Sequence, residues 1–228
     1  MGLRNELRRS SGSSAQPYTW NAWMNNVIPA ANAIHHKNPE PLIFFSGFGY
    51  DVDDTYPIQR QTWNGVTFTP ESYSFKNKIV YEMHNYQNGA SNCGQIQPGL
   101  YKNGYCAMNI HDTSCPNHGP VVMSEFGYDQ GDGSDSGAYA QCLKSILLSQ
   151  PGYPGGWMQW VIAGSYYIRL GVQDNEDSWG KFKSKPITEK IVTDVVHLGL
   201  MNRDWSGWRN GTVVREYVLP FVRETLRL

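Results

Sequence analysis

The sequence predicts an α/β fold with a parallel sheet, and three observations support this. Four short apolar runs recur along the chain, at residues 41–46, 78–84, 120–125 and 156–163. Each run is almost continuously hydrophobic and does not alternate, which is typical of strands that are covered on both faces. Helical patterns separate the runs, and alternation of strand and helix indicates α/β architecture with right-handed crossovers.

Three helices are expected: one before the first of these runs, one between the third and the fourth, and one after the last. Apolar residues recur at three- and four-residue intervals in the first two: Trp20, Trp23, Val27, Ala30, Ala31 and Ile34, then Tyr139, Leu143, Ile146 and Leu147. The third is expected at 213–228, with a bend at Pro220 because proline lacks the N–H that a helix interior needs.

The polar residues at the strand ends favour a (β/α)₈ barrel over a doubly wound sheet. On their C-terminal sides the runs end at or near Ser46, His84 with Tyr86, Glu125 and Trp160. Barrel enzymes place their sites at this end of the strands. No glycine-rich phosphate loop follows any run, which disfavours a dinucleotide fold.

A further short run, ending in Asn5-Glu6, opens the chain. With it we count about five strands where a closed barrel has eight. The prediction is therefore an incomplete barrel, with about strands four to eight present, that fills residues 1–228 as part of a catalytic domain.

Composition limits the classes of function. Hydrophobic residues make up 40% and charged residues 17%, which is a globular composition. The net charge of −1, without a long basic run, disfavours nucleic acid or an anionic membrane as partner. No apolar stretch is long enough to span a bilayer. The aromatic content of 13% mildly favours stacking on sugars, and a monomer is expected.

Four motifs resemble glycoside hydrolase family 5, the cellulase-like enzymes, and are closest to its fungal and plant members. They are LRNELR at 3–8, MHNY at 83–86, SEFG at 124–127 and WVIAGSYYI at 160–168. The resemblance runs from the family's fourth strand to its eighth and covers about residues 1–180 and 200–212.

The resemblance implies that Glu6 is the general acid/base and Glu125 the nucleophile. Retaining hydrolysis needs two carboxyl groups roughly 5–5.5 Å apart, one protonated and one ionised. The two residues lie 119 positions apart in the sequence, so only a closed fold brings them together. No cofactor and no metal ion are needed.

Four more residues are implied to bind the substrate. Asn5 would contact the 2-hydroxyl group, and His84 and Tyr86 would line the site, with Tyr86 hydrogen-bonded to the nucleophile. Trp160 would form a floor under the sugar in the −1 subsite, although Trp157 competes for that role.

The predicted function is a retaining O-glycoside hydrolase that acts on β-linked glucan or a related polysaccharide or glycoside by double displacement. The family's first three strands are absent from the chain, together with an Arg and a His that complete the −1 subsite. The alternative is therefore a truncated, catalytically inactive glycan-binding pseudo-enzyme. The full-length protein is expected to be extracellular.

The four cysteines allow two interpretations. The first is one disulfide within the loop that holds Cys93, Cys106 and Cys115, with Cys142 buried and free. The second is a zinc site, which the spacing disfavours, formed by Cys106, His111, Cys115 and His118.

Residues 181–199 differ from their surroundings. When Gly180 is joined to Leu200, the flanking residues resemble the family's loop after the eighth strand without interruption. The segment also differs in composition, with four Lys and no aromatic residue except Phe182. It is either an unspliced intron in the gene sequence or a genuine surface loop. In both cases we expect it to be exposed and away from Glu6 and Glu125.

Overall fold

A computed structural model of the chain describes residues 1–7, 18–131, 133–149, 155–164, 166–170, 188–192, 198–202 and 205–227. The chain divides into two compact units. Unit 1 comprises Met1–Phe126, Ser136–Gln159 and Arg223–Leu228, and unit 2 comprises Gly127–Asp135 and Trp160–Val222.

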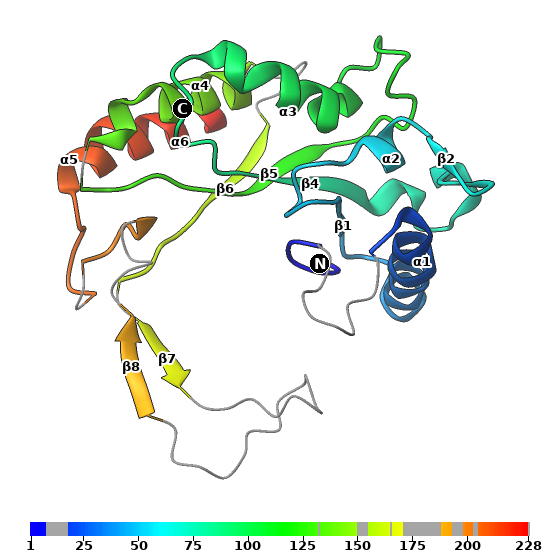
Figure 1. The fold of residues 1–228 in the computed structure, drawn as a ribbon, viewed down its shortest axis with the longest axis horizontal. Coiled ribbons are helices and arrows are strands. Elements are labelled where there is room, and N and C mark those ends of the chain that lie inside the picture. Colours follow the sequence, from blue (N-terminus) through cyan, green and yellow to red (C-terminus); the bar gives the residue numbers. More distant parts are fainter. Residues whose placement is uncertain are drawn as a thin grey trace. The chain divides into compact units, whose positions relative to one another are not determined.

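A four-stranded parallel sheet forms the centre of unit 1 (Figure 1). Its order is β1 (Ile43–Ser46), β4 (Ile79–Asn85), β5 (Val121–Phe126) and β6 (Gly156–Gln159). All four predicted runs are therefore strands, although the last ends at Gln159 and not at residue 163. All seven residues of β4 are buried, which accounts for its continuous hydrophobicity.

The predicted run before Glu6 lies beside β1. Gly2 forms an isolated parallel bridge with Phe44, and the Phe44 N–H donates to the Met1 carbonyl at 3.0 Å. The parallel α/β sheet is thus confirmed, and its assignment to barrel strands four to eight stays a prediction.

Helices α1 (Trp20–Lys37) and α4 (Ala138–Leu148) coincide with the first two predicted helices. The Thr19 hydroxyl caps α1 by accepting the Ala22 N–H. Trp23 of α1 is fully buried, and its indole N–H donates to the Ser46 carbonyl at the end of β1 (2.8 Å). In α4 the predicted apolar face of Tyr139, Leu143, Ile146 and Leu147 is buried.

Shorter elements complete unit 1. They are α2 (Thr55–Ile58), the β2–β3 hairpin (Thr62–Trp63 and Val66–Thr67), α3 (Gln97–Asn103) and the 3₁₀ turns Pro70–Ser72, Lys76–Lys78, Cys93–Gln95 and Tyr105–Met108. Part of the aromatic surplus is core, since the Trp23 ring packs edge-on against Phe45 and Phe68, each at 5.6 Å.

Unit 2 holds an antiparallel pair, β7 (Tyr166–Leu170) and β8 (Thr188–Val192), and the 3₁₀ turn Ser134–Ser136 adjoins it in sequence. The third predicted helix is present as α5 (Gly211–Val213), a π-helical turn (Val214–Val218) and α6 (Leu219–Leu226). The irregular turn lies just before Pro220, which cannot donate a backbone hydrogen bond.

The segment 181–199 contains β8, which pairs with β7. At its end the Leu198 carbonyl accepts the Val161 N–H (3.3 Å), and Gly199 is buried, so the expectation of an exposed segment does not hold there. Residues 181–187 and 193–197 lie outside the described part, and the origin of the segment stays open.

Both disulfides lie in unit 1. Cys106 pairs with Cys115, as a bond within the loop, and Cys93 pairs with Cys142 of α4. The prediction that Cys142 is free is therefore wrong. Since Cys106 and Cys115 are oxidised, the zinc interpretation loses two of its ligands. Within the described ranges, no helix has the length and apolarity to cross a bilayer.

Candidate active site

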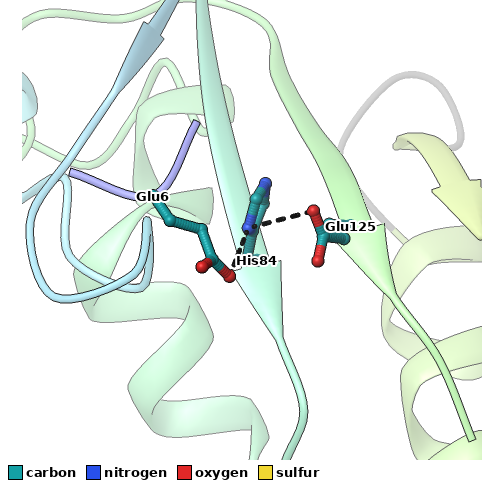
Figure 2. A group of neighbouring side chains, drawn as sticks. All are labelled: Glu6, His84 and Glu125. Carbon is teal, nitrogen blue, oxygen red and sulfur yellow. Dashed lines mark hydrogen bonds and ion pairs between the residues drawn. The ribbon is translucent and has the colours of Figure 1, made fainter. Parts of the chain in front are cut away.

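Three side chains that are distant in the sequence meet at the C-terminal end of the sheet. Glu6 follows the segment beside β1, His84 is the penultimate residue of β4, and Glu125 belongs to β5 (Figure 2). His84 Nδ1 lies 3.4 Å from Glu6 Oε1 and 3.7 Å from Glu125 Oε2. The structure thus brings together the two carboxylates and the histidine that the sequence singled out.

A β-bulge aligns two of these residues. Met83 pairs with Met123, but His84 pairs with Glu125, so β5 carries Ser124 as an extra residue. In an unbroken register His84 would face Ser124, and Glu125 would pair with the next residue of β4. Bulges re-aim side chains beside active sites, and this one places His84 and Glu125 directly opposite each other.

The carboxylates of Glu6 and Glu125 are near each other and are more buried than ordinary surface pairs. One oxygen of Glu6, one of Glu125 and a His84 ring nitrogen all lie within 4.8 Å of one another. The side chains of Glu6 and Glu125 are only 20% and 14% exposed, and His84 is buried. Two oxygens and an imidazole nitrogen are also the donors of a divalent metal site, so the geometry alone fits metal binding or acid–base chemistry.

Tyr86, just after β4, holds one oxygen of Glu125. Its hydroxyl donates to Glu125 Oε1 at 2.8 Å, as the family resemblance implied. Burial and this hydrogen bond raise the pKa of Tyr86 above its usual range. The phenol therefore stays protonated and acts as the donor in this hydrogen bond.

Asp51, which the sequence did not single out, lies beside His84 with its Oδ2 3.8 Å from Nε2 of the ring. It is fully buried, and its carboxylate accepts the backbone N–H groups of Glu6 (2.7 Å) and Leu7 (3.2 Å). Burial raises the pKa of Asp51 to about 6. The available signal was its position, because it follows β1 on the side where the other strands carry their polar residues.

A second contact ties the Glu6 segment to the sheet. Ser46, the last residue of β1, hydrogen-bonds the Arg4 carbonyl at 2.6 Å and the buried carboxyl group of Glu82. The residues before and after Asn5 are therefore both anchored to groups of unit 1.

The structure does not join the remaining predicted residues to this cluster. The Asn5 side chain is exposed, and Trp160, which is 40% exposed, belongs to unit 2. Trp157 packs against Phe126 at 6.0 Å and donates to Thr225 (2.8 Å), so it is a packing residue of unit 1.

Comparisons with known proteins agree on one family. The family model described as "Cellulase (glycosyl hydrolase family 5)" matches residues 1–160. A glycosyl hydrolase 5 family protein of Chamaecyparis obtusa is 29% identical over 223 residues, which are 92% of this chain and 33% of the relative. The chain thus spans about a third of that relative's length.

Two solved structures share the fold. An endo-β-1,4-glucanase of Xanthomonas axonopodis pv. citri, a triple mutant, matches with a TM-score of 0.50 at 16% identity, over 100% of this chain and 59% of its own. XacCel5A matches with a TM-score of 0.51 at 16% identity, over 99% of this chain and 58% of its own.

Proposed function

The chain belongs to glycoside hydrolase family 5, the cellulase family, and from this premise we propose that it is a retaining O-glycoside hydrolase acting on β-linked glucan or a related glycoside. The observation that supports this most is the carboxylate separation. Oxygens of Glu6 and Glu125 lie within 4.8 Å, which is near the roughly 5–5.5 Å of retaining enzymes and below the ~6.5–9.5 Å of inverting ones.

The proposed reaction has two displacements. In the first, the Glu125 carboxylate attacks the anomeric carbon, the bond to the leaving oxygen breaks, and Glu6 gives its proton to that oxygen. In the second, Glu6 takes a proton from water, and the water oxygen replaces Glu125 at the same carbon. Two inversions retain the anomeric configuration.

Each neighbouring group has a proposed part in these steps. Tyr86 holds one oxygen of Glu125 so that the other is free to attack. His84 lies between the carboxylates and orients them. Asn5 is proposed to contact the sugar 2-hydroxyl, and Trp160 to form the floor of the −1 subsite.

Secretion is also part of the proposal. Two disulfides are typical of proteins that fold in an oxidising compartment. A family 5 protein that degrades polysaccharide would meet its substrate outside the cell.

The test is anion rescue of Glu6→Ala, with Glu40→Ala, an exposed glutamate, as the matched control. A substrate with a good leaving group, 2,4-dinitrophenyl β-cellobioside, needs no proton in the first step. Without a base for water, azide should then accelerate turnover of Glu6→Ala and give a β-glycosyl azide. Glu40→Ala should behave like the wild type and ignore azide.

Product stereochemistry supplies the second measurement. The first product that NMR detects from the unmodified chain should have the β configuration. An α product would contradict both carboxylate roles. Binding of cello-oligosaccharides without any turnover would favour the inactive glycan-binding alternative.

A further inference from the structure

The loop between β1 and α2 is strained and closed on itself. The Phe48 N–H donates to the Asp53 carbonyl at 2.8 Å, and the Asp53 N–H returns to the Phe48 carbonyl at 3.2 Å. Within the loop that these two hydrogen bonds close, Gly49, Tyr50 and Asp51 have φ angles of 60°, 67° and 56°. A left-handed conformation is unfavourable for a non-glycine residue and persists only where its surroundings enforce it.

The strained loop places the Asp51 carboxylate under Glu6. Both Asp51 oxygens accept backbone N–H groups there, Oδ2 from Glu6 and Oδ1 from Leu7. Glu6 is itself left-handed, with φ 49°. A buried carboxylate with two N–H donors thus stabilises an unfavourable turn at the residue proposed to deliver the proton.

Asp51 also meets His84 at two points. Its carbonyl accepts the His84 N–H at 2.8 Å, and Oδ2 lies 3.8 Å from Nε2 of the ring. The other ring nitrogen, Nδ1, faces Glu6 and Glu125. The Asp51 carboxylate thus lies against the ring at Nε2, and the two glutamates lie at Nδ1, so Asp51 helps to set which way the ring is turned.

We propose that Asp51 is a positioning residue for the proposed hydrolysis, which it serves by fixing the Glu6 backbone and the His84 ring so that the Glu6 carboxyl group meets the leaving oxygen. The inference rests on the proposed function. Asp51 is fully buried, and its effect passes through Glu6. A displacement of a catalytic group by about 1 Å costs roughly 100-fold in rate.

The experiment compares Asp51→Asn with Asp53→Asn in the 228-residue chain. Both changes remove one carboxylate from the same loop. Among the described residues, however, the Asp53 side chain accepts only the Thr55 N–H, at 2.9 Å. Asparagine at position 51 keeps the shape of the side chain but replaces one carboxylate oxygen with an NH₂ group. That group is a donor and would face the backbone N–H of Glu6 or Leu7. The Asp53→Asn variant should match the wild type in hydrolysis rates and in the exchange of the Glu6 and Leu7 amides.

Two aryl β-cellobiosides that share the cellobiosyl group and differ in the leaving group distinguish a loss of Glu6 positioning from a general loss of activity. Phenyl β-cellobioside needs a proton from Glu6, and the 2,4-dinitrophenyl compound does not. We expect Asp51→Asn to lower kcat/KM for the phenyl substrate roughly 100-fold, and to leave the activated substrate within about threefold of the wild type, because its first step bypasses acid catalysis. An equal loss on both substrates would overturn the proposal.

Amide hydrogen exchange measured by NMR gives a readout that does not need turnover. The amides of Glu6 and Leu7 should exchange slowly in the wild type and in Asp53→Asn, and faster in Asp51→Asn. If these amides stay equally protected in Asp51→Asn, the contact is refuted, whether or not the wild type hydrolyses a substrate. Absence of hydrolysis by the wild type would count against the proposed function and not against the contact.

A variant that fails to fold still leaves a decisive measurement. In the wild-type chain, scalar couplings across the hydrogen bonds should link the Glu6 and Leu7 amide nitrogens to the Asp51 carboxyl carbon. Their absence in a folded wild-type chain would also overturn the proposal.

Discussion

Asp54 is a buried carboxyl group without a hydrogen-bond partner among the described residues. Burial, and then the nearby Asp51 and Asp53 carboxylates, raise the pKa of Asp54 well above its usual range. The native chain therefore binds a proton that the unfolded chain has lost. This group's contribution to stability is intact at acidic pH and is lost as pH rises toward the folded-state pKa.

Asp54→Asn should remove this pH dependence. Asparagine carries no ionisable proton, so the variant should gain stability over the wild type as pH rises from about 4 to 8. Each kcal/mol moves the unfolding midpoint of a chain of this size by roughly 2–4 °C. Thermal midpoints across this pH range for the wild type, Asp54→Asn and the neighbouring Asp53→Asn measure it. Parallel curves for the wild type and Asp54→Asn would contradict the assignment.

Glu125→Gln tests the nucleophile. Glutamine keeps the shape and an oxygen that accepts the Tyr86 hydroxyl, but it cannot form the glycosyl ester. We expect kcat to fall more than about 100-fold with an unchanged unfolding midpoint. The exposed Glu216→Gln serves as control. Retention of more than a hundredth of the wild-type kcat would exclude Glu125 as nucleophile.

At the scale of elements, the Cys93–Cys142 disulfide joins the turn Cys93–Gln95 to α4 across 49 residues. Closing a loop of this length lowers the entropy of the unfolded chain and stabilises the fold by up to about 4 kcal/mol in the chain-entropy model. The Cys106–Cys115 bond closes only 9 residues and should contribute less.

Paired serine variants measure the difference. Cys93→Ser/Cys142→Ser should lower the denaturant midpoint more than Cys106→Ser/Cys115→Ser, under identical non-reducing conditions. Equal losses would show that strain or local packing, and not loop length, sets the contribution of each bond.

At the scale of the whole molecule, the question is whether residues 181–199 are part of the expressed protein or an unspliced intron in the gene sequence. A loop of this length is tolerated at modest entropic cost, so foldability does not decide its origin. Sequencing of the mature transcript does. If the segment is an unspliced intron, the dominant reads join the codons of Gly180 and Leu200. Reads that run continuously through 181–199 would establish a genuine part of the protein, in line with the pairing of β8 with β7.

Local patterns were enough to predict most of the scaffold. The runs that became β1, β4, β5 and β6 are continuous because strands buried on both faces select apolar residues at every position. The helical spacing in α1 and α4 likewise marks the buried face of each helix. Position at strand ends, together with the family motifs, was also enough to single out Glu6, His84 and Glu125.

Other features depend on tertiary contacts that no local pattern encodes. The bulge at Ser124 decides that His84 faces Glu125, because register depends on the pairing of β4 with β5. Cys93 reaches Cys142 only because α4 packs beside the loop after β4. Asp51 looks like a residue of a solvated acidic loop, and only the strained turn that buries it brings its carboxylate to the backbone of Glu6.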